Sequence, residues 1–86
     1  MIAHEVRDRF KQDVIDGFSL KEASASVAEL AKEIKPYKRY GAMRTTAYVF
    51  WDGSAFVAGE QGGFILFTQG DSYAELDKFA IVGTWD

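Results

Sequence analysis

The first part of the chain carries apolar residues at a spacing of three to four positions. Ile2, Val6, Phe10 and Val14 recur every four residues, and this period predicts an amphipathic helix. Gly17 follows the last of these residues, where a left-handed cap would end the helix.

A second helix is predicted directly afterwards. Ser19 and Glu22 have the spacing of a capping box, in which each side chain accepts a hydrogen bond from the backbone amide of the other. The expected buried stripe of this helix is Leu20, Ala23, Val27, Leu30, Ala31 and Ile34. Pro36 should end the helix, because proline disfavours helical geometry in the residue before it. The two helices are expected to pack as an antiparallel hairpin over residues 1–35.

From Thr45 onward the pattern becomes that of β-strands. The segments "TTAYVFW" and "SAFVAGE" are rich in β-branched and aromatic residues, and Asp52-Gly53 separates them. Asp-Gly between two such segments predicts a two-residue hairpin turn, which would pair Trp51 with Ser54.

The rest of the chain predicts a third strand at "FILFTQ" and a fourth at "AIVGTW". Between them, Ser72 and Glu75 again have capping-box spacing, which predicts a short helix over residues 73–78. The expected fold is α+β: an N-terminal helical hairpin packed on an antiparallel β-meander of three to four strands at 45–86. We expect residues 1–86 to form one domain.

Both faces of the predicted sheet carry apolar side chains. In the third strand, Phe64 and Leu66 lie on one face while Ile65 and Phe67 lie on the other, whichever face the helices cover. An apolar face left open indicates a binding surface, and Trp51, Phe56 and Phe67 are its candidate residues. The alternative is that the last strand or strong curvature of the sheet buries the second face within the chain.

The charges are unevenly distributed along an acidic chain of net charge −3. Residues 1–34 carry −2, residues 35–44 carry +4 without an acidic residue, and residues 45–86 carry −5. The basic connector at 36–44 contributes the other candidate partner-binding residues, which are Tyr37, Lys38, Arg39, Tyr40 and Arg44. Bases between aromatic residues suit the rim of a protein interface or a single strand of nucleic acid, and they also suit a solvated joint.

Catalytic chemistry is not indicated. The chain has no cysteine and a single histidine, His4, so a thiolate metal site and a repeated histidine motif are both excluded. His4 and Asp8 have helical spacing but would make a weak two-ligand site, so we expect no metal, no cofactor and no enzymatic activity.

The sequence favours a small, non-enzymatic protein–protein interaction module. Proteins of this composition often act as inhibitors, immunity proteins or phage-encoded modulators, and a homodimer is also expected to be possible. The alternative is a nucleic-acid-binding accessory protein that uses the Tyr37–Arg44 loop; a small-ligand binder is a third hypothesis. Without a signal-peptide pattern or a long apolar segment, we expect a cytoplasmic protein.

Overall fold

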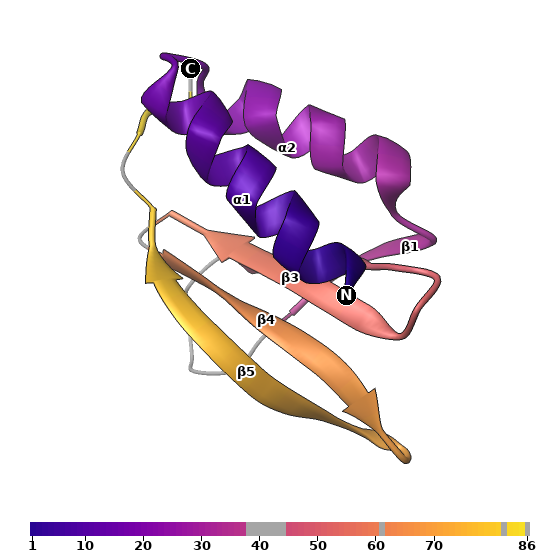
Figure 1. Cartoon of the computed structure of the whole chain (residues 1–86). Helices are drawn as coiled ribbons and strands as arrows, with labels where there is room; N and C mark the ends of the chain where they lie inside the picture. Colours follow the sequence, from indigo (N-terminus) through magenta and orange to yellow (C-terminus); the bar gives the residue numbers. More distant parts are fainter. Residues whose placement is uncertain (38–44, 61, 82, 86) are drawn as a thin grey trace.

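The computed structural model describes residues 1–37, 45–60, 62–81 and 83–85. Two helices come first, α1 (Ile2–Ile15) and α2 (Leu20–Leu30), and both lie on one side of an antiparallel sheet (Figure 1). The strands found in these residues are β1 (Glu33–Pro36), β2 (Thr45–Val49), β3 (Ser54–Gly59), β4 (Gly62–Gln69) and β5 (Ser72–Ala80). The expected α+β class is confirmed, but the sheet has five strands instead of three or four.

The end of α1 is capped at the glycine that the sequence indicates. Gly17 has a φ of 98°, and its amide donates to the carbonyl of Val14 at 3.1 Å. The next amide, that of Phe18, donates to Asp13 at 3.0 Å. This pair of hydrogen bonds is the Schellman motif, which turns the chain sharply into α2.

The start of α1 is capped by residues that lie some fifty positions away in the sequence. The amide of Ile2 donates to Asp52 Oδ2 at 2.8 Å, and the amide of Ala3 donates to Ser54 Oγ at 3.2 Å. The first amides of a helix have no partner within it, so these bonds tie α1 to the β2–β3 turn.

The capping box of α2 is confirmed, but the helix is shorter than the sequence predicts. The Glu22 amide donates to Ser19 Oγ at 3.1 Å, and the Ser19 amide donates to Glu22 Oε1 at 3.2 Å. Helical geometry ends at Leu30, and the amide of Lys32 donates to the carbonyl of Val49 at 2.8 Å. Pairing with β2 therefore converts residues 33–36 into an edge strand, and Ile34 is not part of the helix.

The predicted register of the β2–β3 hairpin is wrong by one residue. Val49 lies opposite Ala55, and the Phe50 amide donates to the carbonyl of Ser54, so three residues form the turn. Within the turn, only Gly53 has a positive φ, of 86°, whereas a two-residue Asp-Gly turn requires it at both positions.

The strand predicted at "FILFTQ" is confirmed as part of β4, but the predictions for the residues after it are wrong. Residues 73–78 belong to strand β5, which pairs with β4 through a turn whose first residue, Gly70, has a φ of 64°. The register shifts once, between Ile65 and Leu66, and this irregularity hides the strand alternation in the sequence. The segment predicted as a fourth strand leaves the sheet after Ala80, and the carbonyl of Thr84 accepts from the Leu20 amide at 2.6 Å.

The core between helices and sheet is built around Phe56. Its ring lies 5.0 Å from that of Phe10 on α1, 5.5 Å from that of Phe79 on β5 and 6.2 Å from that of Tyr48 on β2. Complete burial of such a side chain stabilises the fold by about 1.5–3 kcal/mol.

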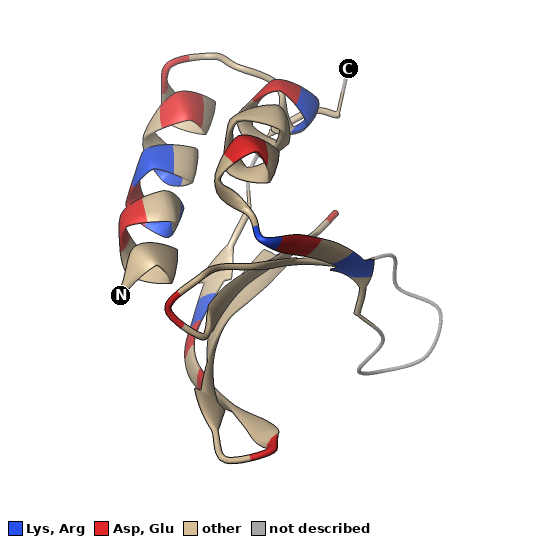
Figure 2. Cartoon of the chain, turned by 90° about the vertical axis from the view of Figure 1, so that its right-hand side faces the viewer, with Lys and Arg blue, Asp and Glu red and all other residues tan. Residues whose placement is uncertain are grey.

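The second face of the sheet is buried as well. Its apolar residues are Ala47, Val49, Ala55, Val57 and Leu66, with Tyr37 and Phe64 packed against them. The ammonium of Lys35 on β1 lies 5.9 Å from the ring centroid of Tyr73 on β5, although these strands are at opposite edges of the sheet. The sheet is thus strongly curled, as Figure 2 also shows, and in the described residues its curvature buries the second apolar face, which is the alternative that the sequence left open.

Neither of the two helices in the described residues has the length and apolar character needed to cross a membrane.

Candidate interaction surface

The eight residues that the sequence singled out for partner binding lie in different environments. Lys38, Arg39, Tyr40 and Arg44 lie outside the described residues. Phe56 has an exposed fraction of 0% at the centre of the core, so its side chain is not on the surface. The residues on both sides of Phe56 in the sequence are apolar, so the sequence alone does not tell whether Phe56 lies in the core or on the surface.

Tyr37 has a structural role where the connector begins. Its ring packs edge-on against Phe64 with centroids 5.7 Å apart, and its amide donates to the carbonyl of Thr45 at 3.0 Å. The hydroxyl of Thr45 donates back to the carbonyl of Tyr37. These contacts close the base of the connector and leave Tyr37 partly buried.

Trp51 is the candidate that the structure places on the surface. It lies in the β2–β3 turn, and its exposed fraction is 75%. The ammonium of Lys32 lies over its ring, 5.3 Å from the centroid, which is a cation–π contact. Phe67, on β4, is only partly exposed.

The turn that carries Trp51 is held in place by the residue after it. Asp52 Oδ1 accepts from the Ser54 amide at 3.0 Å, and Oδ2 accepts from the Ile2 amide of α1. The Thr68 hydroxyl of β4 donates to the carbonyl of Gly53 at 2.6 Å. The backbone beneath Trp51 is therefore anchored to both the helix layer and the sheet.

Burial of the Asp52 carboxyl would by itself raise its pKa. Hydrogen bonds from the Ser54 hydroxyl and from the amides of Ile2 and Ser54 outweigh that effect, and the pKa lies below its ordinary value of 3.8. The ionised form is thus the one that holds the turn.

Two exposed aliphatic residues lie along the sequence on either side of the lysine that contacts Trp51. Leu30, at the end of α2, is 49% exposed, and Ile34, on β1, is 51% exposed. Lys32 lies between them in sequence and reaches the Trp51 ring. We call Leu30, Lys32, Ile34 and Trp51 the Trp51 surface.

The exposure of Leu30 and Ile34 was not predicted, because the sequence pattern places both in a buried helical stripe. The signal that was available is Pro36, since a proline within a short β segment is typical of an edge strand whose neighbours face solvent. Basic residues flank Glu33 along this strand, as Figure 2 shows, so the Trp51 surface combines apolar and positively charged groups.

A second group of exposed apolar residues lies around the turn between α1 and α2. Ile15 and Phe18 flank Gly17, and Trp85 follows Thr84, whose carbonyl binds the start of α2. No basic residue is present in the last turn of α1. This group lies at the other end of α1 from Asp52, so a change in it should not affect binding at the Trp51 surface.

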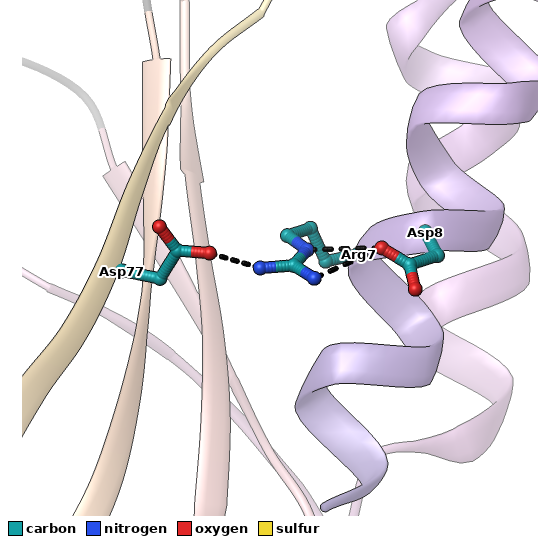
Figure 3. A network of polar contacts seen from close by, with 3 residues as sticks. All are labelled: Arg7, Asp8 and Asp77. Carbon is teal, nitrogen blue, oxygen red and sulfur yellow. Dashed lines mark hydrogen bonds and ion pairs between the residues drawn. The ribbon is translucent and has the colours of Figure 1, made fainter.

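Arg7 and Asp8 of α1 take part in a structural ion-pair network. Arg7 binds Asp8 at 3.0 Å and also binds Asp77 of β5, so it bridges the helix and the sheet (Figure 3). The Asp8 carboxylate that could join His4 at a metal is therefore engaged. Among the residues whose placement is described, no three His, Asp or Glu side chains are grouped to hold a metal ion.

Comparison of the chain with protein-family models, with curated proteins and with solved structures found no match.

Proposed function

We propose that this chain is a non-enzymatic module that binds another protein through the Trp51 surface. The observation that carries the proposal is the 75% exposed indole of Trp51 on an anchored turn, beside a lysine. A large apolar ring is costly to leave in water, and a fixed backbone means that little conformational entropy is lost when a partner covers it.

The partner is expected to offer an apolar pocket with an acidic rim. Tryptophan is among the residues that most often dominate protein interfaces. The exposed Leu30 and Ile34, on either side of Lys32 in the sequence, would add apolar area to the contact. Lys32, whose ammonium lies beside the Trp51 ring, favours carboxylates at the edge of that contact. The module would act in the cytoplasm as an inhibitor, an immunity protein or a phage-encoded modulator.

Nucleic acid is the alternative partner, because a base can stack on an exposed indole while a lysine contacts phosphate. The two exposed aliphatic side chains and Glu33 favour protein instead, since neither group contributes to binding a phosphate backbone.

The first prediction is that Trp51→Ala abolishes capture of the partner. The tagged protein would be used to capture its partner from host lysate, with half of each sample treated with nuclease, and Kd would then be measured by calorimetry with the identified partner. We expect Trp51→Ala to weaken binding by about 2 kcal/mol or more, which is roughly 30-fold, because it removes the central apolar contact.

The matched control is Phe18→Ala, which removes a half-exposed aromatic side chain from the other end of α1. It should leave Kd unchanged. Capture that disappears with nuclease would assign the surface to nucleic acid, and equal binding by Trp51→Ala and the unmodified protein would refute the proposal. A partner that is a second copy of the chain would make the module a homodimer.

A further inference from the structure

A groove of about 210 Å³ lies between the second half of α1 and the end of β5. Its lining residues are Phe10, Lys11, Val14, Ile15, Phe79, Ala80 and Ile81. Six of these seven residues are apolar, and Lys11 is the exception. Asp52 binds the opposite end of α1, so the groove is separate from the Trp51 surface.

The walls of the groove are fixed by the core. The ring of Phe79 stacks on that of Phe56 at an interplanar angle of 27°, and Phe56 in turn packs on Phe10. On the sheet side, a Cβ at Gly63 would lie 2.6 Å from Phe79 Cζ, so the ring lies directly on the glycine backbone. The wall that Phe10 and Phe79 form is thus fixed by the core.

One cation is available at the groove. The ammonium of Lys11 lies 5.1 Å from the ring centroid of Phe79. Arg7, one turn earlier on the same side of α1, is already bound by Asp8 and Asp77 (Figure 3). Within the described residues Lys11 forms no ion pair, so its charge remains available to a ligand.

We propose that this groove binds a small apolar monocarboxylate, such as a medium-chain fatty acid. The hydrocarbon part would lie against Phe10, Val14 and Phe79, and the carboxylate beside Lys11. A dry cavity of about 150 Å³ holds benzene, so one of about 210 Å³ accommodates roughly eight to ten carbons. Binding would also cover part of Ile15, which is 76% exposed at the rim.

A single negative charge is favoured because, among the described residues that line the groove, Lys11 is the one cation. The volume is below the range of about 300–1,000 Å³ typical of pockets for larger ligands, which also favours a small molecule. Trp51 does not line the groove, so the proposal of a carboxylate site and the proposal of a protein interface can be tested independently.

The experiment is titration of the ¹⁵N-labelled full chain with octanoate, below the concentration at which octanoate forms micelles, followed by amide chemical shifts. We expect saturable shifts at residues 10–15 and 79–81, with a Kd on the order of 0.1–1 mM for about ten heavy atoms. Lys11→Met, which keeps an apolar stem without the charge, should weaken octanoate binding by about two- to fivefold.

Lys21→Met is the matched control, because Lys21 is an exposed lysine on α2 outside the groove. It should leave octanoate binding unchanged, and octan-1-ol should bind equally to the unmodified protein and to Lys11→Met. The proposal is overturned by an absence of saturable shifts, by octan-1-ol binding as tightly as octanoate, or by equal effects of the two lysine variants. The proposal would also be overturned if the amide shifts of the groove residues changed on addition of the protein partner but not on addition of octanoate.

Discussion

At the scale of single residues, Asp52 connects parts of the chain that are distant in sequence. Its carboxylate accepts hydrogen bonds from its own turn and from the first turn of α1. A carboxylate at a helix N-terminus also interacts favourably with the helix dipole. Replacement of one side chain therefore affects both the helix start and the turn that presents Trp51.

The lowered pKa of Asp52 leads to a prediction about acid stability. Because the pKa is lower in the folded state than in the unfolded chain, ionised Asp52 contributes its full stabilisation above pH 3.8. This contribution is lost as pH falls below 3.8 and through the lower pKa of the folded state. Asp52→Asn should be less stable than the unmodified protein near neutral pH, and the difference in unfolding free energy should narrow below pH 3.8.

The measurement is urea unfolding of both proteins at neutral and acidic pH. Glu29→Gln, at an exposed carboxylate of α2, is the control and should track the unmodified protein at every pH. A difference between Asp52→Asn and the unmodified protein that stays constant down to acidic pH would show that the charge of Asp52 has no part in holding the turn.

At the scale of helices and strands, the sequence predicts what short-range chemistry determines. The Ser19–Glu22 capping box and the Gly17 cap each involve residues within a few positions of one another, and both are found in the structure. Strand β1 was not predictable in this way, because residues 33–36 become a strand only through pairing with β2. Tertiary pairing outweighs the helical period there.

In strand β5, a local pattern predicts a helix where the structure has a strand. Ser72 and Glu75 match a capping box, yet the register shift opposite Ile65 and Leu66 breaks the alternation that would have indicated a strand. The β2–β3 register was not predictable because Asp52 binds the start of α1, fifty positions away, and the residues next to Asp52 in the sequence do not indicate this contact.

Gly63 on β4 provides a test of how closely β4 and β5 pack. A Cβ there would lie 2.5 Å from the carbonyl oxygen of Val57 and 2.6 Å from the Phe79 ring. Gly63→Ala is therefore expected to lower the free energy of unfolding by about 2 kcal/mol, the typical cost of overpacking, as measured by urea denaturation.

The neighbouring Gly62→Ala is the comparison, since its Cβ would meet one atom, the carbonyl oxygen of Phe79, at 3.0 Å. Its cost should be clearly smaller. If Gly63→Ala is the milder of the two changes, the ring of Phe79 does not lie on the glycine as described.

At the scale of the whole molecule, curvature decides which apolar residues are available to a partner. The sequence correctly indicates that both sheet faces are apolar, but it does not encode how far the edges curl towards each other. The sequence predicts Trp51 as a strand residue of an open face. Its place in the turn, the burial of Phe56 and the exposure of Leu30 and Ile34 all required the three-dimensional arrangement.

Phe56 joins the helix layer to the sheet, and its removal should affect the entire molecule. We expect Phe56→Ala to reduce the free energy of unfolding by about 3–5 kcal/mol, because a buried ring is replaced by a cavity. Trp51→Ala should change it by less than about 0.5 kcal/mol, as is usual for exposed positions. Urea denaturation followed by circular dichroism measures both, and similar losses for the two variants would contradict the described core.

The hydrogen bonds that the Asp52 and Ser54 side-chain oxygens accept from the first amides of α1 have a consequence for signalling within the molecule. A partner that clamps the Trp51 turn would also restrain the helix that the turn caps, and any ligand that favours the folded arrangement stabilises it by linkage. Binding of a partner at the Trp51 surface would then be detectable at the start of α1, as slower exchange of the Ile2 and Ala3 amide protons with solvent.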